Sequence, residues 1–168
     1  MKESLERGWV LLDQILNTQL IQFKDQLNTW EEAIQLAAAP LIENDSIEQT
    51  YVDKIISNTK ELGPYYVIGP NIALPHARPE FGVKQMGLSF LVMKEPVWFS
   101  DKDHHKVQLI IVLAAVDNQS HLEALSELAA VLGEELNVNQ LIHSKSKDDF
   151  LEQLFSFIQY YSSLNCIQ

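Results

Sequence analysis

Two side chains in the segment GPNIALPHARPE, residues Gly69 to Glu80, could carry out chemistry together. His76 directly follows a proline, and Arg78, one of only two arginines in the chain, stands two residues later. Near neutral pH an uncharged imidazole can act as a nucleophile, a base or a ligand. A guanidinium offers a planar fork of donors that suits a phosphate. The pair therefore favours phosphate chemistry, with a structural histidine as the alternative.

A second histidine, His121, follows an apolar run and the short polar segment DNQS. If Ser120 is the N-cap of a helix, His121 occupies the first helical position, where free backbone N–H groups favour an anion. The alternative is an ordinary polar residue in a helix's first turn. Because both histidines stand at predicted strand exits, they could share one pocket. We therefore predict a phosphate-sized site made of His76, His121 and Arg78.

The loop that carries His76 is unusually rich in proline, which fixes φ, and in glycine, which permits tight turns. Four of the six prolines and three of the six glycines fall between residues 63 and 82. Fixed φ angles and tight turns hold such a segment without regular secondary structure. A rigid loop beside a sheet is a common place for reactive side chains. We expect His76 to be presented by this kind of loop.

Hydrophobic patterning predicts the elements that must position this loop. Three runs resemble strands, and the last is nearly continuous in apolar residues, which is typical of a strand buried on both faces. They span residues 65–73, 87–93 and 107–116. Capping-box patterns predict four helix starts: TWEE (Thr29–Glu32), SIEQ (Ser46–Gln49), SHLE (Ser120–Glu123) and SKDD (Ser146–Asp149). Another amphipathic helix is predicted near the start of the chain from Leu5, Trp9, Leu12 and Leu16.

These elements predict an α/β fold, a three-layer α/β/α sandwich with a central mixed β-sheet flanked by helices. The 168 residues fit a single domain, 1–168, in which 1–18 form an N-terminal helical extension. Apolar positions on that extension, Trp9 and Leu12, could serve a homodimer.

Composition excludes several classes of function. A net charge of −11 and no segregated basic patch argue against binding to nucleic acid or an anionic membrane. The start of the chain lacks the pattern of a signal peptide, and no apolar run is long enough for a membrane span, so a cytoplasmic protein is expected. The single cysteine, Cys166, has no partner for a disulfide or a zinc site.

Motifs for other chemistries are missing from the sequence. It contains no nucleotide-binding glycine motif and no serine-hydrolase elbow, so we expect no nucleotide cofactor. A zinc site could be imagined from His104 and His105 with His76 and His121. The segment DKDHHK is charged, however, and adjacent histidines rarely face one ion, so we expect no metal.

Two longer stretches resemble a known family. They are GPYYVIGPNIALPHARPEFGVKQMGLSFLV, residues 63–92, and LAAVDNQSHLEAL, residues 113–125. They are similar to the enzyme IIA domain of the sugar phosphotransferase system, mannitol/fructose superfamily (EIIA type 2), and most closely to its ascorbate-specific branch. The resemblance runs from about Ile21 to the C-terminal helix. It implies a phosphotransferase in which His76 accepts a phosphoryl group from the phosphocarrier HPr and passes it to a cysteine of the cognate enzyme IIB. His121 is then expected to assist, and the membrane transporter enzyme IIC is served indirectly.

One departure from the superfamily affects the predicted site. Many members carry an Arg-Glu pair in the helix before the loop, and IISNTKELG has none. Arg78 or Lys60 could supply the missing positive charge. Two other functions stay open: a regulatory module like the nitrogen-type enzyme IIA proteins, and an inactive structural domain.

Overall fold

The computed structural model describes residues 15–165. The predicted helix at Leu5, Trp9 and Leu12 therefore lies outside the described residues, as do most of the predicted extension 1–18 and Cys166. Leu16 is described, and it is buried in the hydrophobic core. Within 15–165, no helix is long and apolar enough to cross a bilayer.

A five-stranded mixed sheet forms the middle layer, in the order β1-β4-β5-β3-β2. β1 runs parallel to β4 and β3 runs parallel to β5, whereas the β4–β5 and β2–β3 pairs are antiparallel. The strands are β1 (Ile21–Lys24), β2 (Val67–Gly69), β3 (Asn71–Ala73), β4 (Gly87–Trp98) and β5 (Lys106–Ala114). The predicted mixed sheet is confirmed.

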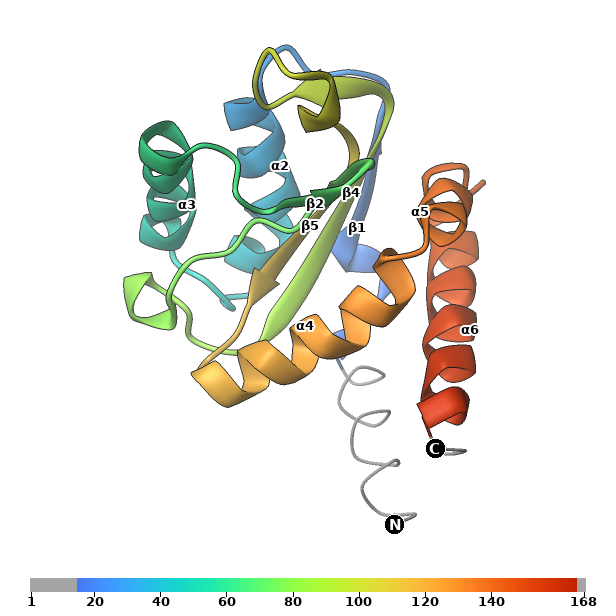
Figure 1. Cartoon of the computed structure of the whole chain (residues 1–168). Coiled ribbons are helices and arrows are strands. Elements are labelled where there is room, and N and C mark those ends of the chain that lie inside the picture. Colours follow the sequence, from blue (N-terminus) through green and yellow to red (C-terminus); the bar gives the residue numbers. More distant parts are fainter. Residues whose placement is uncertain (1–14, 166–168) are drawn as a thin grey trace.

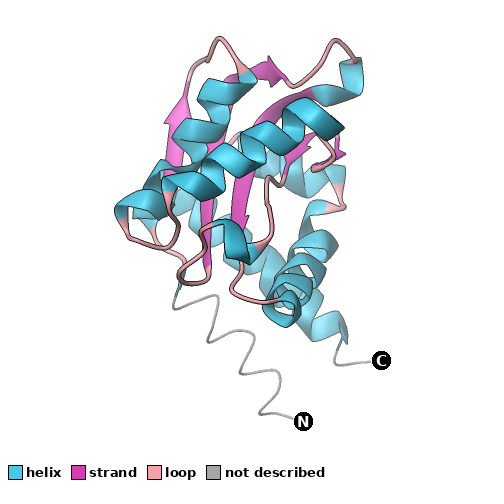
Figure 2. Ribbon diagram, turned by 90° about the vertical axis from the view of Figure 1, so that its left-hand side faces the viewer, coloured by secondary structure: helices cyan, strands magenta, loops and turns pink. Residues whose placement is uncertain are grey.

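Helices cover both faces of this sheet (Figure 1). One apolar cluster joins the sheet to α2 (Trp30–Glu43) and α3 (Gln49–Leu62). A second joins the opposite face to α4 (Asn118–Leu132), α5 (Glu135–Ile142) and α6 (Lys147–Asn165). Figure 2 shows the strands enclosed between these helices. The three-layer sandwich predicted from the sequence is therefore confirmed.

The strand β5 is buried on both faces, as its continuous apolar sequence predicts. Leu109 and Ile111 pack in the cluster that contains α4 and α6. Ile110 and Val112 alternate with them and pack in the cluster that contains α2 and α3. All four side chains have 0% exposure. This strand is the centre of the hydrophobic core and leads toward His121.

The predicted strand 65–73 is instead a tight pair of short strands. β2 and β3 are antiparallel, and Asn71, the first residue of β3, has a φ of 66°. Asparagine tolerates this left-handed conformation better than most residues, and the preceding Pro70 cannot donate a hydrogen bond to a continuing ladder. The chain therefore reverses here, and β3 rather than β2 leads into the loop of His76.

Two of the four helix starts are confirmed. Thr29 Oγ1 accepts a hydrogen bond from the Glu32 N–H at 3.2 Å. Ser146 Oγ likewise accepts one from the Asp149 N–H at 3.0 Å. Both match the capping pattern, in which a side-chain oxygen satisfies a free N–H of the first turn.

The other two helix starts are wrong. α3 has Glu48 as its N-cap, and Ser46 is buried in the preceding turn, where its Oγ accepts a hydrogen bond from Gln85. α4 has Asp117 as its N-cap, and the Asp117 carboxylate accepts a hydrogen bond from the Ser120 N–H at 2.7 Å. His121 is therefore the fourth residue of α4 and not the first.

Candidate functional site

The loop that carries His76 is tied to the central strand by hydrogen bonds. The Leu113 N–H of β5 donates to the Pro75 carbonyl at 3.1 Å. The Tyr51 hydroxyl donates to the Leu113 carbonyl at 2.6 Å and accepts from the Ala77 N–H at 3.1 Å. Burial raises the pKa of Tyr51 to about 12, so this hydroxyl stays protonated near neutral pH. The backbone on both sides of His76 is thus fixed to β5.

The imidazole of His76 is oriented by its own loop. Nδ1 lies 2.7 Å from the Leu74 carbonyl oxygen. Because a carbonyl only accepts hydrogen bonds, Nδ1 carries the hydrogen. In the neutral ring, Nε2 then holds the lone pair. This arrangement suits a nucleophile that reacts through Nε2.

Tyr65 contacts His76 in two ways, and its contribution was missed in the sequence. Its hydroxyl donates to the His76 carbonyl at 2.7 Å. Its ring meets the imidazole edge to face, with centroids 5.7 Å apart. Burial raises the pKa of Tyr65, and a hydrogen bond with Asn58 partly opposes that shift. The position of Tyr65 in the proline- and glycine-rich segment is the one sequence signal that could have identified it.

The side chain of His121, on α4, lies beside the His76 ring. The rings of His76 and His121 lie with centroids 5.0 Å apart and planes inclined by 55°. Burial, and then the neighbouring His76, lower the pKa of His121. A neutral imidazole is therefore favoured near neutral pH, and it can donate one hydrogen bond. The structure brings the two histidines together, while their chemical roles stay predictions.

A cleft of about 270 Å³ surrounds the two histidines. It is lined by Asn58, Tyr65, His76, Ala77, Arg78, Pro79, Asn118 and His121. α3 supplies one wall and α4 supplies another, so the cleft opens at the edge of the sheet where β3 and β5 end. Asn58 and Asn118 were not singled out in the sequence, because an asparagine alone has no distinctive chemistry.

Arg78 lies at the mouth of this cleft. Its side chain is 81% exposed, and its Nη1 lies 3.9 Å from the Glu80 carboxylate. An exposed pair of this kind contributes little to stability and leaves the guanidinium accessible. Lys60, the other predicted source of positive charge, is exposed near the end of α3 and does not line the cleft.

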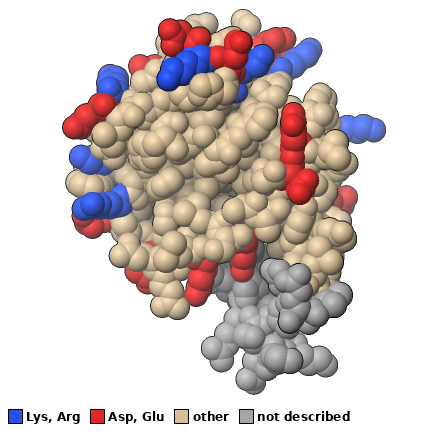
Figure 3. Space-filling model, viewed as in Figure 1, with Lys and Arg blue, Asp and Glu red and all other residues tan. Residues whose placement is uncertain are grey.

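The surface seen in Figure 3 has a broad central area without charged side chains. Most lysine, arginine, aspartate and glutamate side chains in this view lie at its margins. Exposed apolar residues on the segments beside the cleft include Tyr65, Val116 and Leu122. Exposed apolar side chains beside a cleft are suited to contact with another protein.

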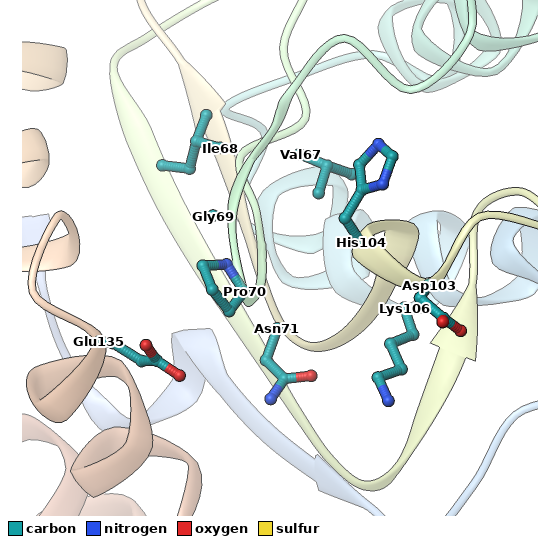
Figure 4. Close-up of a pocket in the computed structure, with 9 residues that line it drawn as sticks. All are labelled: Val67, Ile68, Gly69, Pro70, Asn71, Asp103, His104, Lys106 and Glu135. Atoms are coloured by element: carbon teal, nitrogen blue, oxygen red, sulfur yellow. The ribbon is translucent and has the colours of Figure 1, made fainter.

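A larger hollow of about 530 Å³ lies at the opposite end of β3 (Figure 4). Its polar groups come from Asn71, Asp103, His104, Lys106 and Glu135, beside the β2–β3 turn. The His104 and His105 rings, 4.2 Å apart, are thus separated along the sheet from His76 and His121. In the described part of the chain, no three histidine, cysteine or carboxylate side chains are placed to hold a metal ion.

Comparison with known proteins identifies the family. Residues 14–156 match the model described as "Phosphoenolpyruvate-dependent sugar phosphotransferase system, EIIA 2". The ascorbate-specific PTS system EIIA component of Salmonella choleraesuis is 32% identical over 143 residues, which cover 84% of this chain and 93% of that protein.

Solved structures agree with this match. A putative PTS IIA from Streptococcus mutans has a TM-score of 0.77 and 31% identity, covering 83% of this chain and 89% of that one. The complex of mannitol enzyme IIA and phosphorylated enzyme IIB from Escherichia coli contains a chain with a TM-score of 0.74 and 29% identity, covering 84% of this chain and 97% of that one. The resemblance predicted from the histidine loop is confirmed. The chain belongs to the EIIA 2 family of the phosphoenolpyruvate-dependent sugar phosphotransferase system.

Proposed function

We propose that this chain accepts a phosphoryl group from phospho-HPr on His76 and passes it to the cysteine of a cognate enzyme IIB. The orientation of His76 carries this proposal: Nδ1 is bound to the Leu74 carbonyl, and Nε2 holds the lone pair. The ascorbate-specific relatives support a role in ascorbate-type uptake. The chain would work in the cytoplasm and would serve the transporter enzyme IIC only through enzyme IIB.

The proposed chemistry needs two displacements at phosphorus. In the first, Nε2 of neutral His76 forms a nitrogen–phosphorus bond while the bond from phosphorus to the HPr histidine breaks. In the second, a cysteine thiolate of enzyme IIB attacks the same phosphorus and His76 leaves as a neutral imidazole. Phosphoryl transfer passes through a loose transition state, so the protein chiefly positions the group and supplies donors. His121 is proposed as one donor, and Arg78 is proposed either as a second donor or as a guide for the partner at the mouth of the cleft.

The proposed acceptor has a structural parallel. One of the solved structures that this chain resembles is a complex of mannitol enzyme IIA with phosphorylated enzyme IIB. The exposed apolar side chains beside the cleft, Tyr65, Val116 and Leu122, suit a partner that must place its own reactive group against His76. These observations support an enzyme IIB as the partner that receives the group.

Incubation with phosphoenolpyruvate, enzyme I and HPr, followed by addition of a cognate enzyme IIB, tests the function. We expect an acid-labile phosphoryl group to appear on this chain and then to move to the enzyme IIB. A chain that is never phosphorylated would contradict the proposal. Phosphorylation without transfer to any enzyme IIB would instead favour the regulatory alternative.

Replacement of His121 with alanine is expected to slow transfer by about 100-fold while the fold stays intact, because a donor to developing charge is lost. The rates from phospho-HPr and to enzyme IIB should be measured in single-turnover experiments. His104→Ala, which changes an exposed histidine at the other end of the sheet, is the control. Equal rates for His121→Ala and the unmodified chain would leave His121 without a role in transfer.

Arg78 has two proposed roles that substitutions can separate. If its fork holds the phosphoryl group, Arg78→Lys should impair single-turnover transfer nearly as much as Arg78→Ala, by about 10-fold, because lysine keeps the charge but loses the fork. If Arg78 guides the partner from the mouth of the cleft, the lysine variant should behave like the original chain. The alanine variant should then show weaker, salt-sensitive association. If Arg78→Lys transfers the phosphoryl group at the rate of the original chain, a contact between the Arg78 fork and the phosphoryl group is excluded.

A further inference from the structure

We propose that, inside the cleft, the phosphoryl group on His76 is held by uncharged side-chain donors, the amides of Asn58 and Asn118 together with the His121 ring. The inference rests on the proposed phosphocarrier function. It names the residues that surround the transferred group.

Three backbone N–H groups beside the cleft already have acceptors within the protein. At the start of α4, the Asp117 carboxylate accepts hydrogen bonds from the N–H groups of Ser120 and Gln119. The N-terminus of α4 is thus filled by a protein carboxylate and is not available to a phosphoryl group. The Ala77 N–H, next to His76, donates to the Tyr51 hydroxyl. With these three N–H groups already used, we look to the side chains that line the cleft for donors to the phosphoryl group.

Among the residues that line the cleft, the fixed positive charge of Arg78 lies at the mouth, and a charged form of His121 is disfavoured. Arg78 extends into solvent at the mouth beside Glu80. His121 lies inside, and burial lowers its pKa, so the uncharged ring is its favoured form near neutral pH. Among the lining residues, the remaining side chains with N–H donors are the two asparagines. The interior of the cleft is therefore polar but uncharged.

Asn118 is placed beside His121 by the helix that carries both. It is the first residue of α4 and stands three positions before His121, so the two side chains share one face. Both line the cleft. Within residues 15–165 the Asn118 amide makes no hydrogen bond. Its two N–H groups are available to a group on His76.

Asn58 lines the cleft from α3, on the opposite layer of the sandwich. The Tyr65 hydroxyl donates its single hydrogen to the His76 carbonyl. In the hydrogen bond between Tyr65 and Asn58, the Asn58 amide is therefore the donor and the Tyr65 hydroxyl oxygen is the acceptor. One amide hydrogen thus supports Tyr65, and the second is left for the phosphoryl group. The two asparagines approach His76 from different helices.

Uncharged donors should favour a covalently attached phosphoryl group over a free phosphate ion. They can stabilise a phosphoryl group that a partner has attached covalently, but they exert little long-range attraction on a free anion. The chain's net charge of −11 opposes free phosphate further. The site should therefore distinguish a phosphoryl group delivered by a protein from inorganic phosphate in solution.

Asn118→Asp is the sharpest test, because it keeps the size of the side chain but replaces its N–H donors with a negative charge. An acidic residue in the first turn favours the helix, so the variant should fold normally. We expect single-turnover phosphorylation of His76 by phospho-HPr to slow by about 100-fold in Asn118→Asp and about 10-fold in Asn118→Ala. The phosphorus NMR signal of the phosphohistidine should also shift.

Asn28→Asp is the matched control. It makes the same charge change at an exposed asparagine after β1, at the opposite end of the sheet from His76. Unmodified rates and an unmodified phosphorus signal in Asn118→Asp would overturn the inference. If the unsubstituted protein itself is not phosphorylated on His76, the proposed phosphocarrier function would be overturned instead. The two failures are therefore distinguishable.

A double-mutant cycle tests Asn58. If its amide contacts the phosphoryl group directly, Asn58→Ala should slow transfer by about 10-fold more than Tyr65→Phe, and should still slow it in the Tyr65→Phe background. If Asn58 acts only by supporting Tyr65, the double variant should match Tyr65→Phe, and Asn58 would be removed from the set of phosphate donors. Titration with inorganic phosphate, followed by the NMR signals of His76, should show no saturable binding at millimolar concentration. Tight binding of free phosphate would contradict an uncharged site.

Discussion

Replacing His76 with alanine is expected to abolish phosphorylation of this chain by phospho-HPr. The side chain that supplies the attacking nitrogen would be gone, and no other described histidine has the same combination of a bound Nδ1 and a place in the cleft. Loss of a nucleophile commonly removes a factor of about 10⁶ from a rate. The measurement is labelling by phosphoenolpyruvate through enzyme I and HPr.

His104→Ala serves as the control for this experiment, because His104 is exposed and lies at the other end of the sheet from His76. It should be labelled at the original rate. Circular dichroism should show that His76→Ala remains folded, because the ring is only partly buried. Labelling of His76→Ala at another residue, with His121 the nearest candidate, would show that the nucleophile has been wrongly assigned.

Ile111→Asp is expected to unfold the domain. Ile111 has 0% exposure in the middle of β5, where it is packed in the apolar cluster beneath α4 and α6. The substitution removes a buried aliphatic group and introduces a carboxylate that has no partner, which together cost about 4 kcal/mol or more. Native domains are typically stable by only about 5–15 kcal/mol. We expect the loss of cooperative urea unfolding and of soluble expression.

Ile68→Asp is the matched control for this substitution. Ile68 has 51% exposure on the edge strand β2, so the same change there leaves the carboxylate in water. Surface changes of this kind usually alter stability by less than about 0.5 kcal/mol. A soluble Ile111→Asp chain with a cooperative transition like that of Ile68→Asp would mean that β5 is not the centre of the core.

The meeting of the two histidines could be predicted from the order of the elements. His76 follows β3 and His121 follows β5, and these strands are parallel neighbours. The carboxyl ends of parallel strands meet at one edge of a sheet, so loops that leave them are close. The apolar run of residues 107–116 predicted a doubly buried strand for the same reason that it forms one: alternate side chains point to opposite layers.

The start of α4 shows where local sequence is ambiguous. Asp117 and Ser120 are both good N-cap residues, and only Ser120 is followed three residues later by a glutamate, Glu123, that completes a capping box. The sequence offers both positions, but the helix begins after Asp117, whose backbone is extended directly after β5. The short strand β1 was missed because only Ile21 in it is buried, which leaves no alternating pattern to detect.

The rest of the cleft depends on tertiary structure. Asn58, Tyr65 and Asn118 come from a helix, a loop and another helix, and none has a spacing relation to His76 that marks it in the sequence. Their side chains are common in turns and helix ends for purely local reasons. Their meeting around one imidazole follows from the packing of α3 and α4 on opposite layers, which periodicity does not specify.

The Tyr51 hydroxyl, which joins the Ala77 N–H to the Leu113 carbonyl, has a consequence for turnover. A carrier reacts alternately with a donor and an acceptor, so any loop rearrangement would add to the barrier of both encounters. With the loop attached to β5, its conformational entropy is already lost when the chain folds. The activation entropy of transfer should therefore reflect partner association alone, and it should become more unfavourable in both directions when this hydroxyl is removed in Tyr51→Phe.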